Sequence, residues 1–199
     1  MEDKIRTLLD DTVASLAAGD LESALRLSAE ALATADAALK RLSAEIPAKQ
    51  PDADVKQFLV AADTHVRCLL MASAPVQALS CALLSVCTAD ICRVTERAEC
   101  RGALVALLKT MLIAEMSALD TLPINDQTHE SGKMLLSMTG FLMNSYGGAS
   151  DPLLEQISQI CDVQSEPLID GEATPATDLK RILAEMLGIA VNLGILEFE

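Results

Sequence analysis

The amino-acid sequence predicts an all-α protein of about seven or eight helices, stacked as antiparallel hairpins. Of its 199 residues, 51% are hydrophobic but only 2% are aromatic, so the apolar content comes mainly from Ala, Leu, Ile, Val and Met. Apolar residues recur every three or four positions, and no alternating strand pattern with a hairpin turn occurs. The length suits one hydrophobic core, so residues 1–199 are predicted to form a single domain.

A tight hairpin is predicted at the N-terminus. Its first helix should end at Gly19. Asp20 is placed to cap the second helix, because an aspartate side chain accepts hydrogen bonds from the first free N–H groups of a helix. The second helix should continue to Ile46, since Pro47 does not fit in a helix interior. The two helices are therefore expected to pack as an antiparallel pair.

Six further helices are expected in the rest of the chain. Pro75 suits the first turn of the helix that it begins, and a kink is expected at Gly102 because the helix around it is long. The acidic segment 162–176 contains Pro and Gly and has little apolar periodicity, which predicts a flexible loop before the C-terminal helix. The helices predicted after the hairpin occupy residues 52–72, 75–90, 93–122, 128–145, 151–160 and 178–193.

Small residues lie where the two helices of the N-terminal hairpin must approach each other. They occur in Ala18-Gly19-Asp20-Leu21, Ala24-Leu25 and Ala31-Leu32. In this pattern residues 5–38 resemble a tetratricopeptide repeat. Leu8, Thr12 and Asp36 depart from that family, which favours an aromatic residue, Gly and Pro near these places. The resemblance implies a right-handed superhelix of hairpins, and an irregular helical bundle is the alternative architecture.

The charge balance bears on the class of partner. The chain carries 29 Asp and Glu against 15 Lys and Arg, a formal net charge of -14. Such a surface repels phosphate backbones, and the Arg clusters and aromatic platforms that bind nucleic acids are missing. We therefore expect any charged partner to be basic and expect no nucleic acid. The charged N-terminus lacks the features of a secretory signal, which predicts a cytoplasmic protein.

One segment has the length of a membrane span. Residues 68–89 form a run of 22 uncharged residues, enough to cross a bilayer. The run contains Ser73-Ala74-Pro75, has no Trp or Tyr at either end, and is not followed by a basic cluster. Two buried helices broken at this Ser-Ala-Pro sequence are therefore predicted in preference to a membrane span.

No metal or cofactor site is predicted. The cysteines lack the two-residue gap of a zinc knuckle, so reduced thiols packed in the core are expected, with a metal or redox role as the alternative. They are Cys68, Cys81, Cys87, Cys92, Cys100 and Cys161. The two histidines, His65 and His129, lie outside the Glu-x-x-His motif of di-iron bundles. Glu130 is expected to cap the helix that begins near it.

These observations favour a protein-interaction module and provide no catalytic residue to nominate. A helical scaffold or adaptor, or an acidic chaperone, would hold a peptide or partner helix in a groove. Some tetratricopeptide proteins clamp a terminal carboxylate with Lys and Asn, but the first helix offers only Lys4 and Arg6. The sequence assigns no binding face and allows a homo-oligomer. A helical-bundle enzyme or small-ligand binder is the alternative function.

Overall fold

A computed structural model describes residues 2–43, 51–123, 125–147 and 175–196. Within these ranges the chain forms seven α-helices and no strand, which confirms the predicted all-α class. The helices are α1 (Glu2–Ala17), α2 (Leu21–Ser43), α3 (Asp52–Met71), α4 (Pro75–Ile91), α5 (Arg101–Leu119), α6 (Asp126–Gly147) and α8 (Pro175–Asn192).

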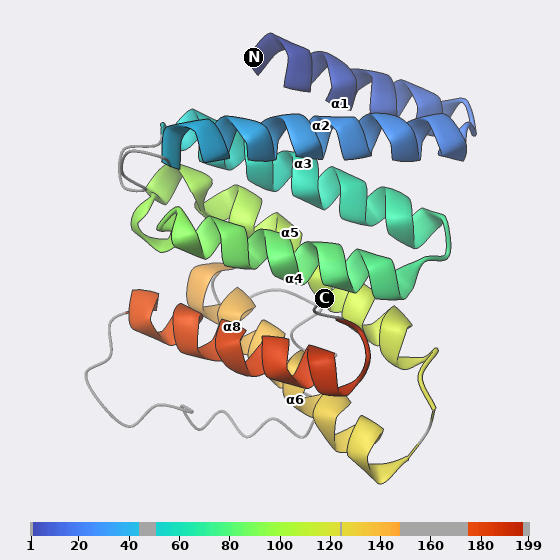
Figure 1. Cartoon of the computed structure of the whole chain (residues 1–199), viewed down its shortest axis with the longest axis vertical. Helices are drawn as coiled ribbons and strands as arrows, with labels where there is room; N and C mark the ends of the chain where they lie inside the picture. Colours follow the sequence, from blue (N-terminus) through green and yellow to red (C-terminus); the bar gives the residue numbers. More distant parts are fainter. Residues whose placement is uncertain (1, 44–50, 124, 148–174, 197–199) are drawn as a thin grey trace.

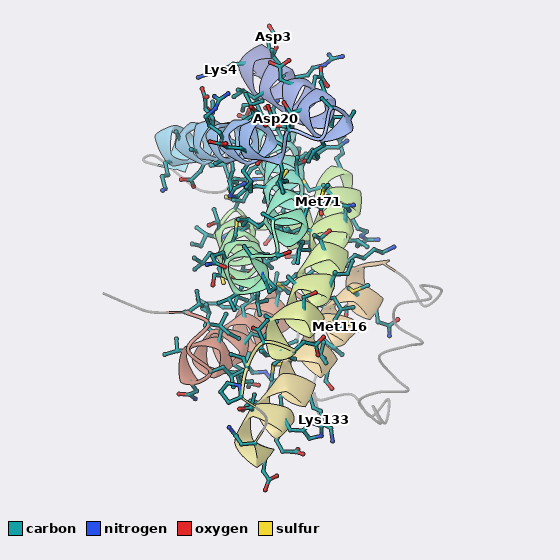
Figure 2. All side chains as sticks on the ribbon, turned by 90° about the vertical axis from the view of Figure 1, so that its right-hand side faces the viewer. Asp3, Lys4, Asp20, Met71, Met116 and Lys133 are labelled. Carbon is teal, nitrogen blue, oxygen red and sulfur yellow. The ribbon has the colours of Figure 1, made fainter. Side chains whose placement is uncertain are left out.

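Helices that are adjacent in sequence pack against each other. Each of α1 to α5 contacts the next helix, α3 also contacts α1 and α5, and α8 contacts α4 and α6. Figure 1 shows α2, α4 and α8 in a front layer, with α3, α5 and α6 behind them. Figure 2 shows the same two layers side by side. One cluster of buried side chains runs through the stack, from Ile5 in α1 to Leu196 after α8.

The N-terminal hairpin forms as predicted. Gly19 has a φ of 76°, a conformation that glycine adopts without a steric penalty. The Ser23 N–H donates to Oδ1 of Asp20 at 3.0 Å, which confirms Asp20 as the cap of α2. Hydrogen bonds from Ser23 lower the pKa of Asp20. Helix α2 is described as far as Ser43, so its predicted end at Ile46 lies outside the described residues.

The uncharged run of residues 68–89 is divided between two helices, as predicted. Helix α3 ends at Met71, and Ser73 adopts a φ of 56° in the turn that follows. Pro75 lies in the first turn of α4, where its missing N–H group costs no hydrogen bond. The turn therefore reverses the chain within three residues and packs α4 against α3.

The helix predicted to begin at residue 93 begins at Arg101 instead. Residues 93–100 form two short 3-10 turns, because Arg93 has a φ of 54° and Arg97 is extended. The Arg97 side chain, only 10% exposed, pairs with the Asp52 carboxylate, and its Nε donates to the Cys92 carbonyl oxygen at 2.9 Å. This pairing holds the elbow between α4 and α5. Gly102 accordingly lies in the first turn of α5 and not in the middle of a helix.

The start of α6 also differs from the prediction. The Thr128 N–H donates to Oδ1 of Asn125 at 2.9 Å, so Asn125 caps the helix, a role predicted for Glu130. An Asn before the first helical residue satisfies a free N–H group directly, whereas Glu130 is exposed one turn later. The helix predicted at 151–160 and the loop predicted at 162–176, up to the start of α8 at Pro175, lie outside the described residues.

Candidate functional site

Three helices of the stack expose side chains on one common side. On α3, Nε2 of Gln57 donates to the backbone oxygen of Glu2 in α1 at 3.1 Å, and Asp63 accepts a hydrogen bond from Thr110 in α5. These contacts mark the directions of α1 and α5 around the axis of α3. Val60 lies between the two directions and points to solvent. The exposed stripe of α3 is thus flanked by α1 on one side and α5 on the other.

The exposed stripe continues onto both neighbouring helices. Helices α1, α3 and α5 run in the same direction, since an antiparallel helix follows each of them (Figure 1). Val13 on α1 lies three helical turns after Glu2, whose oxygen contacts Gln57, and Ile113 on α5 lies three residues after Thr110, which contacts Asp63. Both side chains are therefore on the sides of their helices that border α3. The large apolar side chains Val13, Val60, Met71 and Ile113 are between 40% and 62% exposed. We call this surface the α1/α3/α5 face, and Figure 2 labels Met71, the last residue of α3.

Charged groups of both signs border the α1/α3/α5 face. Arg6 and Lys56 are exposed near the N-terminal ends of α1 and α3, and Asp10 is exposed on α1. Arg67 donates from Nε to Oδ2 of Asp63 at 2.9 Å. Three of these five groups are basic and two are acidic, whereas acidic residues outnumber basic ones in the whole chain. The border of this face is therefore less acidic than the chain as a whole.

A buried polar contact joins two of the three helices of the face, α3 and α5. Thr110 is 2% exposed, and its hydroxyl donates to Oδ1 of Asp63 across the α3–α5 contact. The other carboxylate oxygen of Asp63 accepts from Arg67. A hydrogen bond to a charged group is among the stronger ones, so this contact holds α3 against α5.

A second polar cluster lies between α2 and α3. The Oγ of Ser28 is 3.0 Å from the Leu25 carbonyl oxygen and 2.9 Å from Nδ1 of His65. The contact between Ser28 and His65 joins α2 to α3, and which of the two groups donates depends on the tautomer of His65. Burial lowers the pKa of His65 and raises that of Cys68, whose thiol interacts with Ser28.

This cluster contains the residue types of a nucleophile and its base, but the geometry suits a structural link. Ser28 is fully buried, so a substrate cannot reach its hydroxyl. The hydroxyl also lies 3.0 Å from the Leu25 backbone oxygen, a contact that serine side chains commonly make inside helices. We therefore assign Ser28 and His65 to the packing of α2 against α3.

The most unusual buried group is Glu115 of α5, which is fully buried. Its Oε1 accepts a hydrogen bond of 2.6 Å from Thr139 of α6, and its Oε2 has no partner among the residues that the structure describes. Burial raises the pKa of Glu115 to about 8. The sequence did carry a signal for this position, because Glu115 lies four residues after Met111 and seven after Leu108, on the apolar side of the helix.

The cysteines lie in the core or at its edge. Cys68, Cys92 and Cys100 are buried and Cys81 and Cys87 are half-buried, all as free thiols, whereas Cys161 is outside the described residues. Burial raises the pKa of Cys87 to about 11. Within the described ranges, no three His, Cys, Asp or Glu side chains lie close enough together to hold a metal ion.

One described helical stretch meets the length and composition of a membrane span. It comprises Ala98–Leu119, the 3-10 turn before α5 together with α5 itself. Half of its most apolar window is buried inside the protein, against the neighbouring helices. A core helix of a soluble protein meets the same criteria, so the stretch is weak evidence for a membrane.

Comparison of the chain with protein-family models, curated proteins and solved structures gives no match. The packing of each helix on the next agrees with the stacked hairpins that the sequence predicts. The finer tetratricopeptide resemblance rests on the residues of the N-terminal hairpin alone.

Proposed function

We propose that this protein is a helical interaction scaffold with a tetratricopeptide-like stack, and that it binds a partner protein on its α1/α3/α5 face. The observation that carries the proposal is the group of four large apolar side chains, 40% to 62% exposed, on three neighbouring helices. Single exposed apolar residues are normal, but a group on one side of adjacent helices is typical of an interaction surface.

The construction of the face supports binding without a large rearrangement. The Asp63–Thr110 hydrogen bond joins α3 to α5, and the Gln57 contact joins α3 to α1. Stacked helical hairpins form extended surfaces for proteins and peptides, and a surface held by such contacts loses little conformational freedom on binding.

The partner that fits this face is an amphipathic helix. Its apolar side would cover Val60, Met71 and Ile113, because apolar residues at three- and four-residue spacing match a row of exposed apolar side chains. The net charge of -14 favours a basic partner through its long-range field. Arg6 and Lys56 would pair with a carboxylate at one end of the partner helix. We propose that this scaffold works in the cytoplasm as an adaptor or chaperone.

Quantitative affinity purification of the tagged full-length chain tests this proposal. We compare the parent with Val60→Asp and Met71→Asp, and use Leu84→Asp on the other layer as a matched control. A protein that is retained by the parent and the control but reduced at least about tenfold by both variants on the face supports the proposal. Retention by all four proteins contradicts the face. A small molecule retained without any protein supports the alternative of a ligand-binding bundle.

A further inference from the structure

Helix α8 shows which kind of helix fits against α4 and α6. It packs on both of them, and Figure 1 shows it in the front layer with α4. Five of its apolar side chains are no more than 3% exposed: Leu179, Ile182, Leu183, Met186 and Ala190. They recur at spacings of three, one, three and four residues, which places them on one side of the helix. We call the sides of α4 and α6 that α8 covers the α8 seat.

Contacts at both ends fix the direction of α8 on its seat. Lys180, near the start of α8, interacts electrostatically with Asp90, near the end of α4. Oγ of Ser80, near the start of α4, donates to the Ile195 backbone oxygen at 2.7 Å, just after α8. The two helices are therefore antiparallel. A helix that fits the seat is thus defined by an apolar stripe and by a basic residue near Asp90.

Helix α8 is far in sequence from the helices that it covers. Residues 148–174 separate it from α6, whereas short turns join α1 to α2 and α3 to α4. Connection through the same chain gives α8 an advantage over a helix from another protein. This advantage decreases as the connecting segment becomes longer than the span that it must cross. A helix of similar pattern can therefore compete with α8 for the seat.

One residue within α8 weakens the helix itself. Gly188 is exposed, and a methyl group added to it would meet no atom within 4 Å. Packing therefore does not require a glycine at this position. Glycine inside a helix is less favourable than alanine, because it loses more backbone freedom when the helix forms. Gly188 thus lowers the stability of α8 on its seat and favours its exchange for another helix.

The charge at the seat indicates the chemistry of the competing helix. Asp90 is half-buried, and burial raises its pKa although Lys180 acts to lower it. A closer positive charge would stabilise this carboxylate further. The net charge of -14 attracts basic proteins and repels a second copy of the chain. We propose that α8 is an exchangeable occupant of its seat, and that an amphipathic helix of a basic partner protein displaces it and places a basic side chain beside Asp90.

The first experiment measures how tightly the full-length chain binds a fluorescently labelled peptide of residues 175–196, by fluorescence anisotropy. The Leu183→Ala chain holds its own α8 less tightly, so it should bind the unchanged peptide at least about tenfold more tightly than the parent chain does. The Gly188→Ala chain holds its own α8 more tightly and should bind the peptide up to about fivefold more weakly.

Circular dichroism checks that both variants are folded. A folded Leu183→Ala chain that binds the peptide no more tightly than the parent overturns the proposal. A Gly188→Ala chain that binds it more tightly than the parent does so as well, and this variant keeps the test decisive if Leu183→Ala does not fold.

The second experiment tests the charge and the location of the site. A peptide with Lys180→Glu should bind the Leu183→Ala chain about fivefold more weakly than the unchanged peptide, and Asp90→Asn in the chain should remove this difference. Equal binding of the two peptides contradicts a basic side chain beside Asp90. Val60→Asp should leave peptide binding unchanged. The inference therefore does not rest on the α1/α3/α5 face, and the two proposals fail separately.

Sedimentation velocity decides between a partner protein and a second copy. The parent should sediment as a single chain of 21.1 kDa at the concentrations used for peptide binding. A dimer that Leu183→Ala dissociates would assign the seat to α8 of a second copy and would overturn the proposal.

Discussion

Thr139 of α6 donates a hydrogen bond of 2.6 Å to Oε1 of Glu115 on α5, deep in the contact between the two helices. The second carboxyl oxygen has no partner in the described part of the chain. A carboxylate so placed would lack most of the hydration that stabilises its charge. Burial therefore raises the pKa of Glu115 to about 8, and the group is a neutral acid over most of the physiological pH range.

The first prediction concerns the pH dependence of stability. In the unfolded chain Glu115 titrates near the ordinary glutamate pKa of 4.5, and in the folded protein near 8. Between these values the unfolded state releases the proton first. The free energy of unfolding should fall as pH rises through this window, by at most about 1.4 kcal/mol per pH unit, and level off above it. Glu115→Gln should remove this dependence and be more stable than the parent at pH 8.

Urea melts at pH 5, 6.5 and 8 measure this effect. Glu185→Gln, at an exposed position of α8, is the control and should follow the parent at each pH. Parallel pH profiles for Glu115→Gln and the parent would show that Glu115 ionises freely in the folded protein.

The second prediction compares two glycines with opposite backbone demands. Gly19 has a φ of 76°, and Gly102 lies in the first turn of α5. Neither has a neighbouring atom that an added methyl group would meet within 4 Å. Gly19→Ala should lower stability by about 1 to 2 kcal/mol through backbone strain, whereas Gly102→Ala should raise it by up to about 1 kcal/mol. Thermal melts report both, and equal shifts of the same sign would contradict the backbone argument.

The third prediction concerns the elbow between α4 and α5. Arg97→Ala removes the partner of Asp52 and the donor to the Cys92 carbonyl oxygen. We expect a loss of about 1 to 3 kcal/mol, because a nearly buried hydrogen-bonded charge pair is broken. Arg93→Ala is the control: its guanidinium is 59% exposed and lies 3.8 Å from Glu96, so its loss should cost less than about 0.5 kcal/mol. Equal denaturation midpoints for both variants would place the restraint on the elbow elsewhere.

The fourth prediction tests the docking of α8. Leu183 is 3% exposed and belongs to the common core cluster. Leu183→Ala should cost about 2 to 5 kcal/mol through lost apolar burial and the cavity left behind. Glu185→Ala, two positions along on the exposed side, should change stability by less than about 0.5 kcal/mol. A denaturant melt in which the Leu183 variant matches the parent would remove α8 from the stabilising core.

Local chemistry accounts for what the sequence predicted. Gly19 and Asp20 mark the first turn, and Pro75 marks the second, through conformational preferences that act within a few residues. The start of α5 was predicted wrongly because the restraint on residues 93–100 is a pairing of Arg97 with Asp52, 45 positions earlier. Helical periodicity contains no information on such a contact.

The candidate surfaces needed the structure for a similar reason. Val60 and Leu84 occur in apolar stretches that look equally suited to a core. Both are exposed because the neighbouring helices pack against other sides of α3 and α4. Which side of a helix stays uncovered depends on the order and angle of packing, and these are properties of the assembled stack.

The hydrogen bond from Ser80 to the Ile195 oxygen joins residues 115 positions apart, whereas each of α1 to α5 packs on the next helix along the chain. Contacts between sequence neighbours form early because they close only short loops, which costs little conformational entropy. A distant contact must first overcome the entropy of closing a long loop. Folding should therefore proceed along the stack, with α8 docking last. Native-state hydrogen exchange should show α8 opening at a lower free energy than α3. Helix α8 would then detach and unfold while the rest of the stack stays folded.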